Sequence, residues 1–279
     1  MIIIRFAWLS LVLCVMAGAA AADDAKPQPT AKDARSGLRC IFKMNVILIK
    51  NFDVIAKAAG IGYQNLGYGV DLDKPLKQGF KFLEDTPRTL MEKGEVDVCL
   101  TVAQNWAAEP ALDKWAPAGL AHNPNFRLYQ QARFLQEKPE ERDNSKIADV
   151  QAALDKVRKT LEVRVDAINK DLGKQVVFIV PVGDAIVKLR EMVVDGKFPG
   201  VTKQSELFMS GYKGALHAEK HVNLLTAYCN YAAIYQKSPV GLKLEMKEDI
   251  TDEQHAILQK LAWETVSQYP HAGLNGLKK

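Results

Sequence analysis

The fold is decided by residues 176–242, which read VVFIVPVGDAIVKLREMVVDGKFPGVTKQSELFMSGYKGALHAEKHVNLLTAYCNYAAIYQKSPVGL. The apolar run 176–180 is typical of a strand buried in a parallel sheet. A helix pattern follows over 184–194, and a second one comes after Leu216-His217 and continues to about residue 236. Open α/β folds place their chemistry beyond the carboxyl ends of the strands, where helices begin. We therefore expect His217, at the mouth of the second helix, to belong to a functional site.

The same alternation extends through the chain. Apolar runs at 38–42, 96–102 and 176–180 predict strands, and 127–135 fits a strand or a helix equally well. The clearest helix pattern covers 139–172, where apolar residues recur every three or four positions. Residues 115–125 are rich in Pro, Gly and Asn and indicate a connection. Strands that alternate with helices predict one α/β domain, with a parallel sheet covered by helices on both faces.

The first residues, MIIIRFAWLSLVLCVMAGAAAADD, have the features of a secretory signal peptide. Arg5 precedes a short apolar region, and an alanine run supplies the cleavage signal. The alternative is a membrane anchor, but the apolar run is shorter than the ~20 residues that a span needs. The sequence predicts a signal peptide over 1–22, a disordered lead-in over 23–37 and one domain over 38–279. We expect a secreted or periplasmic protein without a membrane span after cleavage.

Composition narrows the classes of function. The formal net charge is +4, and no basic stripe with interleaved aromatic residues suggests nucleic acid as a partner. The expected mature chain keeps Cys40, Cys99 and Cys229, and the last two have the pattern of small core residues. No motif indicates a disulfide framework, a metal site or a cofactor, and the sequence leaves the oligomeric state open.

Five residues are candidates for chemistry at the carboxyl edge of the sheet. His217 could act as a general base or simply be a surface or capping residue. Asn105 follows a predicted strand and could donate to an oxyanion, as could the N–H groups of Gly67 and Gly69, although turn geometry explains all three. Asn45 ends the first strand, where a nucleophile would be presented, but an amide is not an acyl-transfer nucleophile.

Two further residues have competing interpretations. Asp184 follows a predicted strand, and we expect it to cap the helix that begins there rather than to take part in catalysis. His221 would lie one helical turn after His217 on the same face. That spacing can bind a metal ion, but no third ligand is visible in the sequence.

With these residues in view, the sequence resembles the SGNH (GDSL-like) hydrolases, especially secreted bacterial members of unassigned specificity. The resemblance is clearest in VPVGDAIVKLREMVVDGKFPG, SELF and LHAEKHVNLLTAYCNYAAIYQKSPVGL, and it also touches IFKMN, EVDVCLTV and NPNFRLYQQA. It covers most of the predicted domain in the expected order. It implies a three-layer, flavodoxin-like parallel sheet flanked by helices.

The resemblance also implies hydrolysis of an ester or acetyl group by a serine, a histidine and an oxyanion hole. The histidine falls on His217, the oxyanion asparagine on Asn105, and the oxyanion glycine on Gly67 or Gly69. The serine position holds Asn45, and the position of the aspartate that orients the histidine holds Gly214. The chain departs from the family at both.

Two hypotheses follow. The first is a secreted SGNH-like hydrolase of a small-molecule or carbohydrate ester, with His217 as base and with another nucleophile. The second is a catalytically inactive protein of the same fold that binds a glycan or another small ligand. The substituted nucleophile favours the second, and the retained His217 and Asn105 favour the first.

Overall fold

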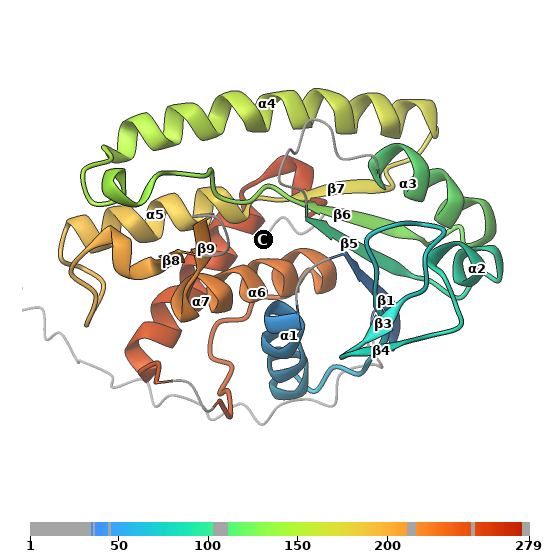
Figure 1. Cartoon of the computed structure of the whole chain (residues 1–279), viewed down its shortest axis with the longest axis horizontal. Helices are drawn as coiled ribbons and strands as arrows, with labels where there is room; N and C mark the ends of the chain where they lie inside the picture. The colour runs from blue at the N-terminus through green and yellow to red at the C-terminus, as the bar shows by residue number, and fades with distance from the viewer. Residues whose placement is uncertain are drawn as a thin grey trace, which may run out of the picture. The chain divides into compact units, whose positions relative to one another are not determined.

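The computed structural model describes residues 35, 37–43, 46–102, 111–210, 216–246 and 249–274. Within the unit that begins at Arg35, a seven-stranded sheet lies between two layers of helices (Figure 1). The predicted signal peptide and nearly all of the predicted lead-in lie outside the described residues. No helix in the described part of the chain is both long and apolar enough to cross a bilayer.

The parallel part of the sheet has the order β2-β1-β5-β6-β7. Numbered among themselves along the chain, these strands run 2-1-3-4-5, which is the order of a flavodoxin-like doubly wound sheet. Their bounds are Leu38–Lys43 (β1), Tyr63–Tyr68 (β2), Val98–Val102 (β5), Arg127–Gln131 (β6) and Val177–Val180 (β7). The predicted strands at 38–42, 96–102 and 176–180 are confirmed, and the ambiguous stretch at 127–135 begins with a strand.

Two antiparallel hairpins add to this frame. One extends the sheet beyond β2 and consists of β3 (Lys77–Gln78) and β4 (Lys81–Phe82). The other is a separate pair of strands, β8 (Phe208–Ser210) and β9 (Leu216–Ala218). All four strands are only two or three residues long, so their sequences show too little alternation to have been predicted.

Helices cover both faces of the sheet. Their bounds are Val46–Ala58 (α1), Pro87–Glu92 (α2), Ala111–His122 (α3), Ile147–Asp171 (α4), Val182–Val194 (α5), Lys220–Tyr235 (α6) and Asp252–Ser267 (α7). Side chains of α1, α5, α6 and α7 pack into one apolar cluster, which includes Phe42, Tyr129 and Val180 from the sheet. Helices α2, α3 and α4 supply most of the helical residues in the cluster on the other face. This arrangement confirms the predicted three-layer α/β class.

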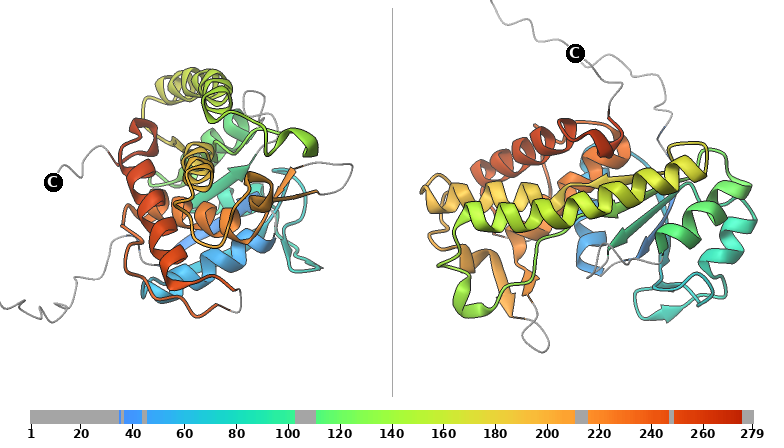
Figure 2. Two further views of the ribbon diagram at one scale, coloured as in Figure 1. Left: turned by 90° about the vertical axis from the view of Figure 1, so that its left-hand side faces the viewer. Right: turned by 90° about the horizontal axis from the view of Figure 1, so that it is seen from above.

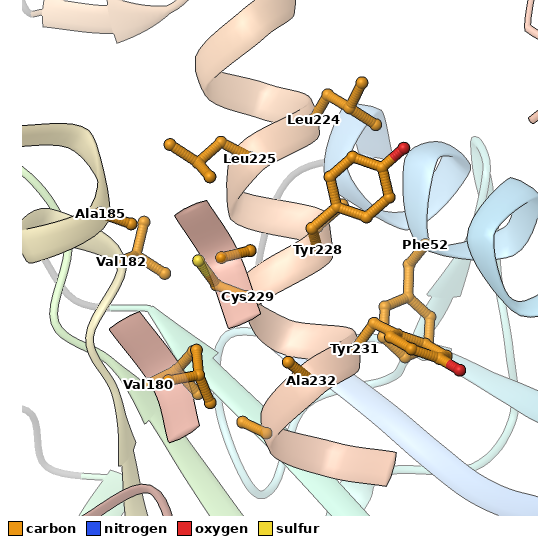
Figure 3. Packing of buried hydrophobic residues seen from close by; sticks show 14 of the residues in the cluster. Phe52, Val180, Val182, Ala185, Leu224, Leu225, Tyr228, Cys229, Tyr231 and Ala232 are labelled. Carbon is orange, nitrogen blue, oxygen red and sulfur yellow. The ribbon is translucent and has the colours of Figure 1, made fainter. Parts of the chain in front are cut away.

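Helix α6 is buried on nearly every side, because its sequence is apolar almost all round. Figure 3 shows Cys229 and Ala232 of α6 near Val180 and Val182, while Tyr231 lies on the side of Phe52 from α1. Helix α6 therefore packs against the residues around Val180 on one side and against α1 on the other. It also fixes the position of the segment that precedes it, which includes His217.

Helix α3 corrects the prediction of a connection over 115–125. Pro117 lies inside the helix, which continues past it to His122. Leu112 and Trp115 are buried and tie the helix to the sheet. A Cβ atom at Gly119 would lie 2.5 Å from the ring of Phe126, so glycine is needed there for close packing. Residues that indicate a loop locally therefore serve tertiary contacts in this helix.

Candidate functional site

In an open α/β sheet, ligands bind beyond the carboxyl ends of the strands, where the strand order reverses. Here that point lies between β1 and β5, since the chain proceeds from β1 to β2 on one side and from β5 to β6 on the other. The segments that directly follow these two strands, 44–45 and 103–110, are outside the described residues. Asn45 and Asn105 lie in these two segments. Gly214 lies in the segment 211–215, which is also outside the described residues.

His217 is the predicted site residue whose surroundings are best described. It lies on β9 opposite Met209, two residues before Glu219, the N-cap of α6. The strand forms because Leu216 faces the core while His217, the next residue, faces solvent. Within the described residues, no hydrogen bond or ion pair involves the imidazole of His217. No hydroxyl or carboxylate of the described residues is therefore hydrogen-bonded to it.

A side chain distant in the sequence fixes the position of His217. Gln136, in the connection after β6, uses both ends of its amide on the backbone of Leu216. Its Oε1 accepts from the Leu216 N–H at 2.7 Å, and its Nε2 donates to the Leu216 carbonyl at 3.4 Å. The residue directly before His217 is therefore held to the carboxyl side of the sheet by a contact that spans 80 positions.

Replacing Gln136 by alanine is expected to release this backbone while leaving the fold intact. The loss of a hydrogen bond to the backbone should cost about 1 kcal/mol, which corresponds to roughly fivefold faster exchange of the Leu216 amide proton. Hydrogen exchange followed by NMR measures it directly. Gln136→Glu is the matched control, because a carboxylate still accepts from the Leu216 N–H. Unchanged exchange in Gln136→Ala would show that the contact does not hold β9.

The N–H groups of Gly67 and Gly69 are already engaged. Gly67 donates to Asn65 Oδ1 at 2.9 Å, and Gly69 donates to the carbonyl of Phe42 at 3.0 Å. A Cβ atom at Gly67 would lie 2.9 Å from the carbonyl oxygen of Lys77, and its φ is +120°. Glycine at this position lets β3 approach β2 closely. In this arrangement neither N–H is available to an oxyanion.

Ser205 and the three buried cysteines do not replace the missing nucleophile. Ser205 donates its hydroxyl to Asp143 Oδ2 at 2.8 Å. Cys40, Cys99 and Cys229 are buried, as expected for Cys99 and Cys229. Burial raises the pKa of the Cys40 and Cys229 thiols far above the ordinary value, so both stay protonated and unreactive.

Two other interpretations from the sequence change. Asp184 does not cap α5, whose N-cap is Pro181, because it lies inside the first turn and is bound by Arg158 from α4. His221 lies in α6 whereas His217 lies in β9, so the two are not successive on one helical face. The described residues contain no cluster of three or more His, Cys, Asp or Glu that could hold a metal ion.

A cavity of about 370 Å³ begins directly after β9, between the N-terminal ends of α6 and α7. Among its walls are three carboxylates, one ammonium group and one imidazole, so the surface is strongly polar. The lining residues are Gly200, Val201, Glu206, Glu219, Lys220, His221, Asp249, Thr251 and Gln254. The sequence did not indicate this cavity, because it gathers residues from three separate segments.

His221 and Gln254 are the buried polar side chains among the described residues of this cavity. His221 is 5% exposed, and its Nε2 has no hydrogen-bond partner among these residues. The ring packs edge-on against Phe198, with the centroids 5.2 Å apart. Burial lowers the pKa of His221 below the ordinary 6.5, and Lys220 adds to this, while Gln254 and Glu206 offset part of it. The lowered pKa favours the neutral ring, and its Nε2 is buried beneath the surface of the cavity.

The carboxyl ends of the central strands are also polar, which sequence reasoning overlooked. Thr101 on β5 and Gln130 on β6 are paired in register, and their side chains are 2.6 Å apart. Gln131 is 2% exposed, and its Nε2 has no hydrogen-bond partner in the described part of the chain. Two adjacent glutamines at the end of an otherwise apolar strand were the available signal, since buried amides are uncommon.

Comparisons with known proteins extend to the fold only. Neither a known protein family nor a curated protein matches the sequence. Among solved structures, the chain is similar to a DUF4886 family protein from Bacteroides uniformis. The TM-score is 0.52 at 9% identity, and the match covers 84% of this chain and 95% of that one. The likeness supports the α/β architecture and leaves the resemblance to SGNH hydrolases untested.

Proposed function

We propose that this chain is an exported, SGNH-like protein that binds a small polar ligand and lacks an assembled hydrolytic site. The observation that carries the proposal is the isolation of the His217 imidazole among the described residues. Acyl transfer by this type of site needs a nucleophile and a base within hydrogen-bond reach, and a group that orients the base. The sequence itself supplies Asn45 and Gly214 where the serine and the aspartate would stand.

The cavity after β9 supplies a place for the ligand. Glu219 makes no capping bond to α6, so its carboxylate can accept hydrogen bonds from a bound molecule. Lys220 and Thr251 add donors to the lining. A ligand with many hydroxyl groups can donate and accept at the same time, which this mixed lining requires. We therefore propose a glycan fragment of one or two sugar units as the ligand.

Ester hydrolysis is the second candidate. It is favoured by the retention of His217 and by the Gln136 contact, which holds the segment carrying His217 at the carboxyl side of the sheet. Another serine or threonine, such as the exposed Ser210 on β8, would then have to act as the nucleophile.

The two candidates separate in one experiment. The purified chain and its His217→Ala variant are incubated with p-nitrophenyl acetate and, separately, with a fluorophosphonate probe. Binding without catalysis predicts equal turnover of the two proteins and no label on either. Labelling of a mapped serine or threonine, together with slower turnover in His217→Ala, would reverse the assignment in favour of hydrolysis.

The ligand site is tested with N-acetylglucosamine, glucose and their β-linked disaccharides as probes. Saturation-transfer NMR should detect binding, and the His221 Hε1 resonance should move on addition of sugar. Glu219→Gln and Asp249→Asn should each weaken binding about tenfold, since each removes a charged hydrogen-bond acceptor. Glu253→Gln is the control, because Glu253 is an exposed carboxylate on the first turn of α7 outside the lining. If no sugar binds, or if all variants bind alike, the cavity is not the site.

A further inference from the structure

The hairpin β3–β4 exposes large apolar side chains to solvent. Gly79 and Phe80 form its two-residue turn, and Gly79 has φ +60°, as the first central position of a type II′ turn requires. Phe80, at the tip, is 105% exposed, and Phe82 is 61% exposed. Figure 2 shows the hairpin, in cyan, at an outer edge of the fold.

The stability of the fold does not explain why the rings of Phe80 and Phe82 are exposed. The hairpin is anchored by Leu76, which is fully buried, and by the bond from the Leu83 N–H to the Leu76 carbonyl at 2.8 Å. A tight turn of this type favours small or polar residues, and a solvated ring at the tip adds nothing to the core. Val70, which follows β2, is also 71% exposed. The edge of the sheet thus carries apolar surface that has no partner among the described residues.

The charges nearest to the rings are positive, and acidic residues flank the hairpin on both sides. Residues 74–83 contain three lysines and no acidic residue. Of the acidic residues nearby, Asp73 is paired with Arg88 and Asp85 with Lys93. Asp71 and Glu84 are exposed and form no ion pair within the described residues. The Lys77 ammonium lies 4.3 Å from the centre of the Phe82 ring, directly across the hairpin. The exposed rings therefore lie within a locally cationic segment.

We propose that this hairpin docks the protein on an anionic lipid surface, with Phe80 and Phe82 inserted among the acyl chains and the lysines at the headgroups. Aromatic rings beside long cationic side chains suit the boundary between headgroups and hydrocarbon. A protein partner fits less well, because the centres of protein interfaces are depleted of lysine and a stable interface buries ~800 Å² on each side. A two-residue hairpin tip offers far less area, and a bilayer needs no shape complementarity.

The affinity for the membrane has an electrostatic contribution from the lysines and a hydrophobic contribution from the two rings. Each lysine near an anionic membrane strengthens binding roughly fivefold at physiological ionic strength. Withdrawal of two rings from hydrocarbon weakens binding about tenfold or more. Attachment by one small hairpin is consequently reversible and sensitive to salt.

The test uses the full chain and vesicles of phosphatidylcholine with or without about 30% phosphatidylglycerol, a composition chosen on the order of physiological surface charge. In Phe80→Trp, the emission in excess of that of the wild type comes from position 80. Brominated acyl chains should quench it on anionic vesicles and much less on neutral ones. This readout reports insertion of the tip itself, whatever the remainder of the chain does.

Sedimentation with the vesicles gives the affinity. Phe80→Ser/Phe82→Ser should reduce binding to anionic vesicles about tenfold or more. Val163→Ser, which removes a 64% exposed apolar side chain from α4, should change nothing. Since both sets of substitutions are at exposed positions, the variants should fold normally, which circular dichroism checks. Absence of quenching in Phe80→Trp on anionic vesicles, or equal sedimentation of the serine variants and the wild type, would overturn the proposal.

Discussion

Substitution of Gly183 by alanine is expected to destabilise the protein by about 3 kcal/mol, because the backbone around it leaves no room for a methyl group. An added Cβ would lie 2.7 Å from the carbonyl oxygen of Arg133 and 2.9 Å from Leu154 Cδ1. The Gly183 N–H also donates to the Ala132 carbonyl at 2.6 Å, so the strain cannot be relieved without loss of that bond.

Urea denaturation of Gly183→Ala measures this loss as a lower transition midpoint at constant slope. Gly196→Ala is the matched control, since its added methyl group meets nothing within 4 Å while its φ of +66° is unfavourable for alanine. Backbone strain alone should cost about 1 kcal/mol there. If the two variants were equally stable, close packing at the start of α5 would not be what demands glycine at 183.

The second large effect concerns a buried ion pair. Arg190 on α5 is 3% exposed, and its Nη1 lies 2.8 Å from Glu137 Oε2 in the connection after β6. Its Nε also donates to Gln204 at 2.7 Å. Glu137→Ala would leave a buried guanidinium without its counter-ion. Such a change is expected to cost about 3–5 kcal/mol, because the desolvated charge is no longer compensated.

Thermal or urea unfolding of Glu137→Ala gives the magnitude, and a double variant gives the cause. Glu137→Leu/Arg190→Met removes both charges together and should recover much of the lost stability. Asp195→Ala, which breaks an exposed pair with Lys197, should have little effect. A double variant as unstable as Glu137→Ala would mean that side-chain packing, and not the unpaired charge, accounts for the loss.

The fold could be predicted where periodicity is strong and continuous. The run at 176–180 and the long pattern that contains α4 identified a parallel sheet with helices on its faces. Helix α3 could not be predicted in the same way. Pro117 and Gly119 lower its local helix propensity, and the buried contacts of Leu112 and Trp115 override that preference only in the folded chain.

The candidate site was harder to predict from the sequence than the fold. His217 could be singled out by its residue type, but its strand has three residues and depends on a partner strand and on Gln136. The cavity beside it joins residues near 200, 220 and 250 through the packing of α6 against α7. Neither contact leaves a local pattern in the sequence, because both are made by segments brought together only at the tertiary level.

The packing of α6 against α1 also limits how early the chain can complete its folding during synthesis. Phe52 of α1 stacks on Tyr235 of α6 with the ring centres 6.0 Å apart, and Arg35 donates to the Ile234 carbonyl 199 positions away. At a synthesis rate of ~5–20 residues per second, α1 is made on the order of ten seconds or more before α6, against which its apolar side packs. Through that interval the apolar face of α1 stays uncovered in the nascent chain, which favours aggregation at this stage.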